Sequence, residues 1–213
     1  MTPLSQIPLA ERVRPQSLDE FIGQKHLVAP GKVLEQMLRN NKAHSIIFWG
    51  PPGVGKTTLA QIIAHTLDIP FFTLSAIDSG VKEVRAIIET ARKMGHALLF
   101  IDEIHRFNKG QQDSLLGAVE KGIITLIGAT TENPSFEVIS ALLSRCQVYV
   151  LKALEEEHLK AMVMQALNTD TWLLNQQVTV IEWGALLQLS GGDGRRLLNL
   201  LELVVASMPD GKK

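Results

Sequence analysis

The chain contains 213 residues, of which 46% are hydrophobic, and its formal net charge at pH 7 is −1. This length and composition allow a substantial hydrophobic core, in one large domain or in two small ones. The near-neutral charge excludes a polycationic chain, so any contact with nucleic acid requires a local basic patch.

Cysteine usage and the N-terminal sequence predict a cytoplasmic protein. The single cysteine, Cys146, excludes an intramolecular disulfide and suits a reducing compartment. Residues 1–15 carry charges and prolines where a secretory signal needs an apolar segment, and no apolar run approaches membrane-spanning length. The six histidines have no zinc-like spacing. We therefore expect no membrane partner and no structural zinc.

Short apolar runs indicate the strands of a sheet. Five such runs lie at positions 45–49, 71–75, 97–101, 125–129 and 147–151. Each is apolar nearly throughout rather than alternating, which favours strands buried on both faces of a parallel sheet. Helical stretches separate most of them, at 58–67, 82–93 and 111–120. This strand-then-helix order predicts a three-layer α/β domain.

The pattern changes after Lys152. Positions 154–167, 179–189 and 195–208 are predicted to form amphipathic helices, and no apolar strand run lies between them. We therefore place a domain boundary near Lys152. An α/β domain is predicted at 1–152, followed by a small all-helical domain at 153–213.

The turn between the first run and the first helix has the spacing G-x-x-x-x-G-K-T. It comprises Gly50, Pro51, Pro52, Gly53, Val54, Gly55, Lys56 and Thr57, and Thr58 follows it in the helical stretch. Between a strand and a helix, this spacing predicts a phosphate-binding loop, because glycines let backbone N–H groups close around phosphate oxygens. Lys56 would reach the β- and γ-phosphates, and the Thr57 hydroxyl would ligate Mg²⁺. The alternative is a simple turn rich in glycine and proline.

Two adjacent carboxylates end the third apolar run. Asp102 and Glu103 lie at the carboxyl end of that strand, the edge at which α/β sheets bind ligands. Asp102 can hold the Mg²⁺ shell, which leaves Glu103 free to polarise a water for attack on the γ-phosphate. A second carboxylate at this position favours water, rather than a small-molecule substrate, as the acceptor of the γ-phosphoryl group. The alternative for Glu103 is the polar start of the next helix.

Several segments together resemble the AAA+ ATPases of the clamp-loader and RuvB-like branches. Within them, the chain is similar to the RarA family (replication-associated recombination protein A, also called MgsA). The resemblance extends from about Leu9 to Met208, and it rests most on the segments 79–83, 102–113, 127–136 and 140–145. It implies that the helical domain is a lid over an ATP site in the α/β domain.

The resemblance also implies roles for individual residues. Thr130 matches sensor 1, which orients the attacking water, and Arg145 matches the arginine finger that reaches into a neighbouring subunit. Arg195 matches sensor 2 at the head of the last helix, with the adjacent Arg196 as a competing candidate. For each arginine the alternative is an ordinary solvated position.

An N-terminal segment completes the implied nucleotide site. The stretch 9–15 and the residues around Ile22 and Gly23 resemble the part of the family that packs on adenine through backbone and apolar contacts. ATP and Mg²⁺ are therefore the expected ligands.

Four cations match positions that face the central channel of clamp-loader-like ATPases and contact the DNA backbone. They are Lys82, Arg85, Arg106 and Lys109, and Gln112 corresponds to a residue that couples this contact to the ATP site. The alternative is four solvated cations on helix surfaces. Because aromatic residues are few, we expect contacts mainly to phosphates, independent of base sequence and sensitive to salt.

The expected function is Mg²⁺-dependent ATP hydrolysis coupled to DNA remodelling in replication and recombination. The resemblance implies maintenance of stalled forks, with a fork or a single-stranded/double-stranded junction as the DNA. It also implies a single-stranded-DNA-binding protein as partner, a homo-oligomer and a cytoplasmic location on the nucleoid. The family continues into a further helical domain beyond the residues present here. Two alternatives are a clamp-loader-type ATPase subunit and an ATP-binding scaffold that does not hydrolyse.

Overall fold

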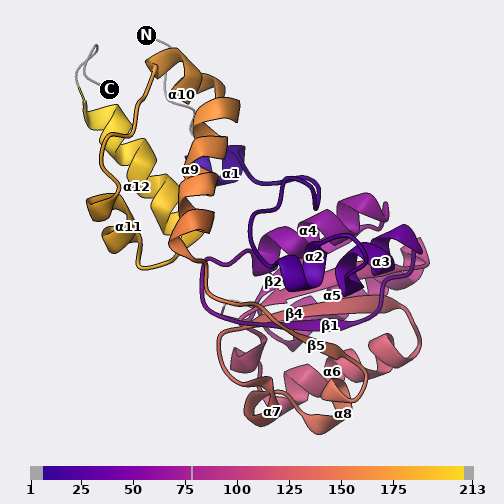
Figure 1. Cartoon of the computed structure of the whole chain (residues 1–213). Helices are drawn as coiled ribbons and strands as arrows, with labels where there is room; N and C mark the ends of the chain where they lie inside the picture. The colour runs from indigo at the N-terminus through magenta and orange to yellow at the C-terminus, as the bar shows by residue number, and fades with distance from the viewer. Residues whose placement is uncertain (1–6, 78, 209–213) are drawn as a thin grey trace.

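The computed structural model describes residues 7–77 and 79–208 of the chain. The five apolar runs form one parallel sheet of order β2-β3-β4-β1-β5 (Figure 1). The strands are β1 (Ile46–Trp49), β2 (Phe71–Ser75), β3 (Ala97–Asp102), β4 (Ile124–Thr130) and β5 (Gln147–Val150). The predicted α/β class, with a parallel sheet and a separate group of helices, is confirmed.

Helices cover both faces of the sheet. One face packs against α2 (Lys25–Val28), α3 (Val33–Arg39) and α4 (Lys56–Thr66), and the other packs against α5 (Val81–Met94), α6 (Lys109–Glu120) and α8 (Ser140–Leu143). Successive residues of a strand point to opposite faces, so Phe48 joins the first cluster while Ile47 joins the second. The three-layer arrangement follows from this alternation.

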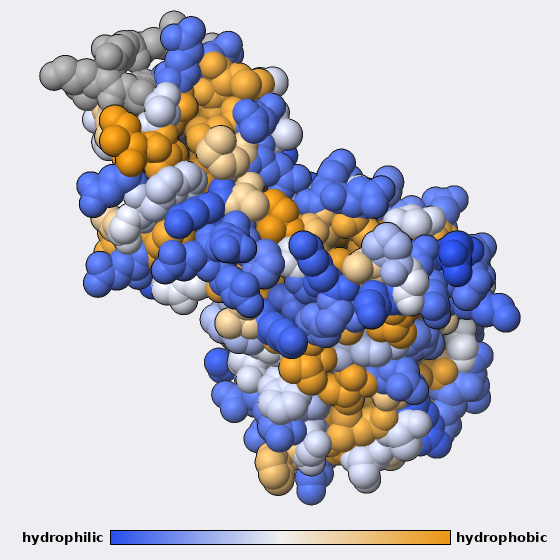
Figure 2. Space-filling model, viewed as in Figure 1, coloured by the Kyte–Doolittle hydropathy of each residue, from blue (hydrophilic) through white to orange (hydrophobic). Residues whose placement is uncertain are grey.

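Burial on both faces holds for the central strands only. All seven residues of β4 are buried, whereas in β5 only Tyr149 is even partly covered. The expectation of five fully buried strands was therefore wrong for β5, and in β2 only Leu74 is buried. Both strands lie at the edges of the sheet, where a strand has one neighbour and helices cover it incompletely. Figure 2 shows hydrophobic atoms at the surface around β5, where Val148 and Val150 are exposed.

The C-terminal helices gather beyond one end of the sheet (Figure 1). They are α9 (Glu156–Thr169), α10 (Thr171–Gln176), α11 (Gly184–Ser190) and α12 (Gly194–Ser207). The chain enters them through Lys152, whose backbone N–H and C=O both pair with the buried side-chain amide of Gln24, at 2.9 and 2.7 Å. This clamp ties the start of the helical group to the segment in front of α2.

The predicted helix at 179–189 was too long, because only its second half is helical. Gln177 adopts a left-handed conformation that ends α10, and residues 178–183 form neither helix nor strand. Val178 and Val180 pack against the core, while Thr179 between them and Ile181 after them are exposed. The β-branched side chains at positions 178–181 lower the helix propensity of this segment. Short elements such as α1 (Leu9–Arg12), η1 (Ile104–Arg106) and α7 (Pro134–Glu137) were not predicted.

Helix α1, although far away in sequence, packs on α12 of the helical group. Arg12 forms ion pairs with Asp170 at 2.7 Å and with Glu202 at 2.6 Å, and its guanidinium lies 5.9 Å from the ring centre of Trp172. Glu202 also accepts a hydrogen bond from the backbone N–H of Leu9. The predicted boundary assigned α1 to the α/β domain. In the structure, these ion pairs join α1 to the helices after Lys152.

Acid is expected to weaken this junction through Asp170. Burial acts to raise the pKa of Asp170, but hydrogen bonds from Arg12 and from the backbone of Leu173 hold that pKa below its usual value. A lowered folded-state pKa contributes stability above the unfolded pKa of 3.8, and that stability is lost as the pH falls through the folded value. The free energy of unfolding should therefore decrease as the pH falls below about 4.

Asp170→Asn tests this expectation, because asparagine can still cap α10 but carries no charge. At pH 7 the variant should lose about 2 kcal/mol, measured by urea unfolding. Its unfolding free energy should also vary less with pH between 4 and 2 than that of the wild type. Identical acid profiles for the two proteins would contradict the assignment to Asp170.

Candidate active site

A cavity of about 230 Å³ lies between the phosphate loop, the end of β3, the N-terminal segment and the helical group. The predicted residues that line it are Ile22, Pro52, Gly53, Val54, Gly55, Lys56, Thr57, Thr58, Asp102, Glu103 and Arg195. Several apolar side chains line it as well, among them Ala10, Val13, Phe21, Leu154 and Met162. The cavity therefore has a polar wall suited to phosphates and an apolar wall suited to a base.

The loop backbone depends on glycine at Gly55. This residue caps α4 with φ = +98°, and a Cβ atom built on it would lie 2.5 Å from Cζ of Phe21. Any larger residue would therefore meet both backbone strain and a clash. Lys56 follows at the first position of α4, where the helix N-terminus favours a bound anion.

The Lys56 ammonium is turned back onto its own loop. It is buried, and Nζ donates hydrogen bonds of 2.7 Å to the carbonyl oxygens of Gly50 and Pro51. Burial lowers the pKa of Lys56, and the charges of Asp102, Glu103 and Asp193 oppose that effect. These two carbonyl contacts hold the ammonium at the loop. Gly50 and Pro51 themselves do not line the cavity.

The last helix docks directly on the phosphate loop. The N–H of Gly194 donates to the Gly53 carbonyl at 3.2 Å, and a Cβ atom on Gly53 would lie 2.1 Å from Oδ1 of Asp193. Asp193 also caps α12 by accepting from the backbone N–H of Arg196. This docking places Arg195 at the cavity, while Arg196 does not line it. Sequence reasoning missed Asp193, although Asp before a helix is a common capping signal.

Asp102 and Glu103 line the cavity opposite the phosphate loop. Oδ1 of Asp102 accepts from the N–H of Glu103 at 3.1 Å, and Glu103 adopts a left-handed conformation with φ = +55°. Glu103 does precede η1, as the alternative reading proposed, but its side chain makes no capping bond there. Its carboxylate instead lies 3.3 Å from Nε2 of His105 and 3.7 Å from Nε of Arg106.

The donor set fits a nucleotide-bound Mg²⁺. The carboxylate of Asp102 and the hydroxyl of Thr57 line one cavity, and Mg²⁺ with a nucleotide takes one or two protein oxygens plus phosphates and waters. Within residues 7–77 and 79–208, no group of three or more His, Cys, Asp or Glu could hold a metal by itself. A cation at this site would therefore depend on the nucleotide.

Thr130 and Gly23 lie close to the cavity but do not line it. Thr130, the last residue of β4, is fully buried, and its hydroxyl lies 3.0 Å from Nδ1 of His105. A Cβ atom on Gly23 would lie 3.0 Å from a methyl group of Leu154, so Gly23 supports the cavity wall from behind. Sequence reasoning gave no role to His105 or to Arg14, which lines the cavity and bonds to the Thr58 hydroxyl at 3.1 Å.

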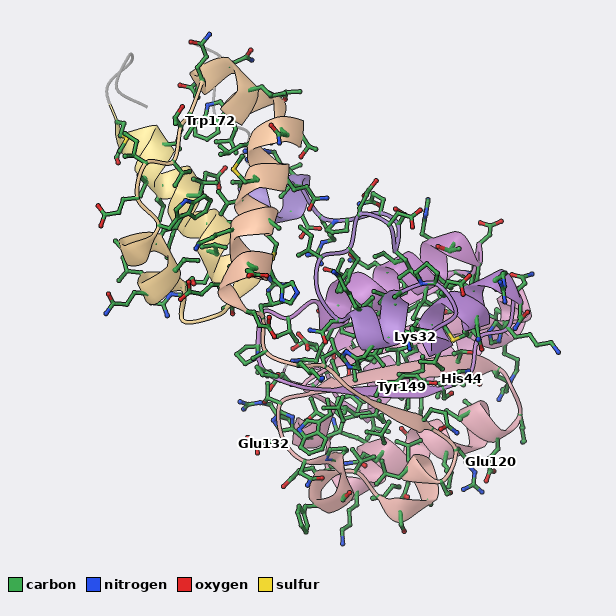
Figure 3. The ribbon with its side chains drawn as sticks, in the orientation of Figure 1. Lys32, His44, Glu120, Glu132, Tyr149 and Trp172 are labelled. Atoms are coloured by element: carbon green, nitrogen blue, oxygen red, sulfur yellow. The ribbon has the colours of Figure 1, made fainter. Side chains whose placement is uncertain are left out.

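Arg145 lies far from this cavity. It precedes β5, at the amino edge of the parallel sheet, whereas the phosphate loop follows β1 at the carboxyl edge. Its guanidinium pairs with Glu120 at 2.5 Å and with the carbonyl of Ala141 at 2.7 Å. Figure 3 shows Glu120 at the opposite end of the α/β layers from Glu132, which follows Thr130. Arg145 therefore cannot reach the cavity of its own chain.

The four candidate DNA-binding cations are all exposed. Lys82 and Arg85 lie in the first turns of α5, and Arg106 and Lys109 lie at η1 and at the start of α6. Gln111 joins the two starts, because its side-chain amide donates to the Ser79 carbonyl at 2.8 Å. Both helices pack on the same face of the sheet. The structure thus brings the N-terminal ends of α5 and α6 together.

Residues 46–154 match the family described as "ATPase family associated with various cellular activities (AAA)", and the chain belongs to this family. In the described part of the chain, no helix is long and apolar enough to cross a membrane.

Two relatives show more specifically which proteins the chain is similar to. The chain is 48% identical over 97% of its length to replication-associated recombination protein A of Escherichia coli (strain K12). It is also 43% identical over 93% of its length to ATPase WRNIP1 of Dictyostelium discoideum. These matches cover 48% and 23% of the two relatives, so the chain spans about half or less of each.

A solved structure titled as the Thermotoga maritima RuvB Holliday junction branch migration motor superposes with a TM-score of 0.73. It is 31% identical to the chain, and the match covers 89% of this chain and 64% of that one. Together with the relatives, this match confirms the predicted resemblance to the RarA family and to the RuvB-like AAA+ ATPases.

Proposed function

We propose that the chain binds ATP with Mg²⁺ in the cavity and hydrolyses it there. The observation that carries this proposal is the convergence of Lys56, Thr57, Asp102, Glu103 and Arg195 on one cavity, from three distant parts of the sequence. The apolar wall, to which Ile22 contributes, would receive adenine. Names of relatives support the same reaction, since one of them is called an ATPase.

Each residue has a proposed task, and all of them except Thr130 line the cavity. Lys56 leaves the loop carbonyls and binds the β- and γ-phosphates, while the loop N–H groups hold the remaining phosphate oxygens. Glu103 accepts a proton from the attacking water, and Thr130 orients that water from the end of β4. Arg195 neutralises charge that develops on the γ-phosphate. Thr57 and Asp102 would hold Mg²⁺, which when bound would stabilise the charge on the phosphate oxygens.

Arg195 also connects the reaction to movement. It belongs to α12, and α12 docks on Gly53 of the phosphate loop. A γ-phosphate that binds Arg195 therefore pulls on the helical group, and its release frees that group. We propose this as the route by which hydrolysis moves the helical group, which acts as a lid over the α/β domain with the boundary near Lys152.

The partner proposed for this movement is DNA. Lys82, Arg85, Arg106 and Lys109 would bind backbone phosphates at a fork or at a single-stranded/double-stranded junction, and the neighbouring N-terminal ends of α5 and α6 favour bound anions. The names of the relatives support roles in replication-associated recombination. We also propose that the protein forms a homo-oligomer and has a single-stranded-DNA-binding protein as partner. Its proposed role is the maintenance of stalled forks, at a cytoplasmic location on the nucleoid.

Each of the four cations is expected to contribute about equally to DNA affinity, whatever the base sequence. Replacing one of them with alanine should weaken binding to a junction and reduce the slope of log affinity against log salt by about 1. Fluorescence anisotropy with two unrelated sequences measures both quantities. Lys32→Ala is the control, because Lys32 is exposed beside α3 on the other face of the sheet (Figure 3). Equal losses in Lys32→Ala and in the four variants would contradict the assigned surface.

ATP turnover against protein concentration tests the proposed reaction, with and without a DNA junction. Activity that rises with concentration and with DNA supports a motor whose subunits complete one another. Tight ATP binding without turnover supports the second candidate, a scaffold that does not hydrolyse. Turnover that appears only with unrelated subunits supports the third, a clamp-loader-type component.

A further inference from the structure

One histidine joins two of the proposed catalytic residues. The imidazole of His105 has Nε2 at 3.3 Å from a carboxylate oxygen of Glu103 and Nδ1 at 3.0 Å from the hydroxyl of Thr130. The ring is mostly buried, since its side chain is 12% exposed. Both of its polar atoms are therefore engaged, one with the residue proposed to activate water and one with the residue proposed to orient it.

The backbone brings this ring to β4 in a defined way. The left-handed conformation of Glu103 turns the chain sharply after β3, and η1 then packs against β4. Gly128 of β4 allows the approach, because a Cβ atom there would lie 2.9 Å from Cδ1 of Ile104 in η1. Only a residue without a side chain leaves room for Ile104, and His105 follows Ile104 directly.

Hydrogen-bond donors and acceptors settle the tautomer. A carboxylate only accepts hydrogen bonds, so Nε2 of a neutral His105 must carry the proton that reaches Glu103. Nδ1 then has a lone pair, and it accepts from the Thr130 hydroxyl. That hydroxyl has one proton and two acceptors within reach, because the carbonyl of Glu132 lies 3.1 Å away. It can donate to His105 or to Glu132, but not to both.

We propose that His105 is a positioning residue that transmits the orientation of the Thr130 hydroxyl to the Glu103 carboxylate. With the hydroxyl turned to His105, the ring is fixed from both sides and holds Glu103 in one orientation. With the hydroxyl turned to Glu132 or to a phosphate, Nδ1 loses its donor and the hold on Glu103 weakens. The hydrogen-bond partner of the Thr130 hydroxyl thus affects the orientation of Glu103, the residue proposed to activate water. This inference rests on the proposed role of Glu103 in ATP hydrolysis.

Two substitutions separate this bridge from simple packing. His105→Asn keeps an amide near the place of Nδ1 but does not reach Glu103, whereas His105→Gln keeps one near the place of Nε2 but does not engage Thr130. Both variants should bind a fluorescent ATP analogue within about twofold of the wild type and lose about 10- to 100-fold in kcat. Retention of wild-type kcat by either variant, with its thermal unfolding midpoint unchanged, would overturn the bridge.

The chain offers a matched control at the other end of β4. His96 contacts the hydroxyl of Thr125 at 3.3 Å through Nε2 and the carbonyl of Gly122 at 2.9 Å through Nδ1, away from the cavity. His96→Asn removes the same kind of histidine–threonine pair and should leave kcat unchanged. An equal loss of kcat in His96→Asn and His105→Asn would assign both effects to general damage and overturn the proposal.

Nuclear magnetic resonance tests the bridge without relying on activity. At pH 8.5, at which free histidine is neutral, the ¹⁵N spectrum of the full chain should show the Nε2–H tautomer for His105, assigned with His105→Asn. Thr130→Val should shift its Nδ1 resonance, and Glu103→Gln should shift Nε2. An Nδ1–H tautomer, or no response to Thr130→Val, overturns the bridge.

The turnover measurements and the NMR spectra together distinguish this inference from the proposed function. If the wild type and Glu103→Gln show the same turnover, the proposed catalytic role of Glu103 is wrong. The spectra still show whether His105 joins the two side chains. If Glu103→Gln loses turnover and the His105 variants keep it, the proposed function stands and the bridge fails.

Discussion

Glu103→Gln is expected to lower the rate of ATP turnover by about 10²–10⁴-fold while ATP affinity stays within about twofold of the wild type. Glutamine has nearly the same shape but cannot accept a proton from water. The variant keeps Lys56 and Asp102, the residues proposed to bind phosphate and Mg²⁺, so it should hold ATP and stall. Single-turnover hydrolysis and equilibrium binding of a fluorescent ATP analogue measure the two quantities separately.

Two comparisons make this result specific. Glu89→Gln removes the same charge from an exposed position on α5, where Glu89 pairs with Arg92, and it should leave turnover unchanged. Lys56→Ala should instead lose ATP affinity, because it removes the contact to the β- and γ-phosphates. Equal turnover in the wild type and Glu103→Gln would remove the carboxylate from the mechanism and favour the scaffold.

Arg145→Ala is expected to lower turnover by about 10³–10⁵-fold in the assembled protein, without changing ATP affinity. The reason is geometric. Arg145 lies at the amino edge of the sheet and the cavity lies at the carboxyl edge, so this guanidinium can act only on the site of another copy. Steady-state turnover at several protein concentrations, together with ATP binding, checks the prediction.

Mixing two inactive variants provides a sharper test of action between subunits. Lys56→Ala cannot use its own site but still carries Arg145, and Arg145→Ala has an intact site but lacks the guanidinium. A mixture should recover part of the wild-type turnover that neither variant shows alone. Glu120→Gln, which frees Arg145 from its ion pair, should keep the affinity for ATP. If mixtures stay inactive while the wild type turns over and self-associates, the assignment of Arg145 is wrong.

Local pattern was sufficient for most of the α/β layers. The five strands, the phosphate loop and the helices after β1, β2 and β3 were predicted within a few residues, because each has a continuous apolar run or a clear helical period. The errors occur where tertiary position matters. β5 is exposed because it is an edge strand, which its apolar sequence does not reveal. Residues 178–183 form no helix although their spacing resembled one.

The sequence was sufficient to propose those parts of the candidate site in which adjacent residues act together. The phosphate loop and the pair Asp102 and Glu103 each occupy one turn of chain, so their spacing alone indicates their chemistry. Contacts between distant residues were not predictable. Arg14 reaches Thr58 across 44 positions, and Asp193 meets Gly53 because α12 folds back onto the loop. Such pairs depend on how the helices pack, and no local pattern encodes that.

The parallel α/β class and the phosphate loop could be predicted from the sequence, because apolar runs and local spacing carry that information, and the segments quoted above carry the resemblance to the RarA family. The folded structure was needed to show which residues share one cavity, that Arg145 lies away from that cavity, and that His105 joins Glu103 to Thr130. His105 and Thr130 are 25 positions apart. Their contact exists because η1 packs against β4 over Gly128, and such a fit depends on side-chain volumes in the folded core rather than on sequence spacing.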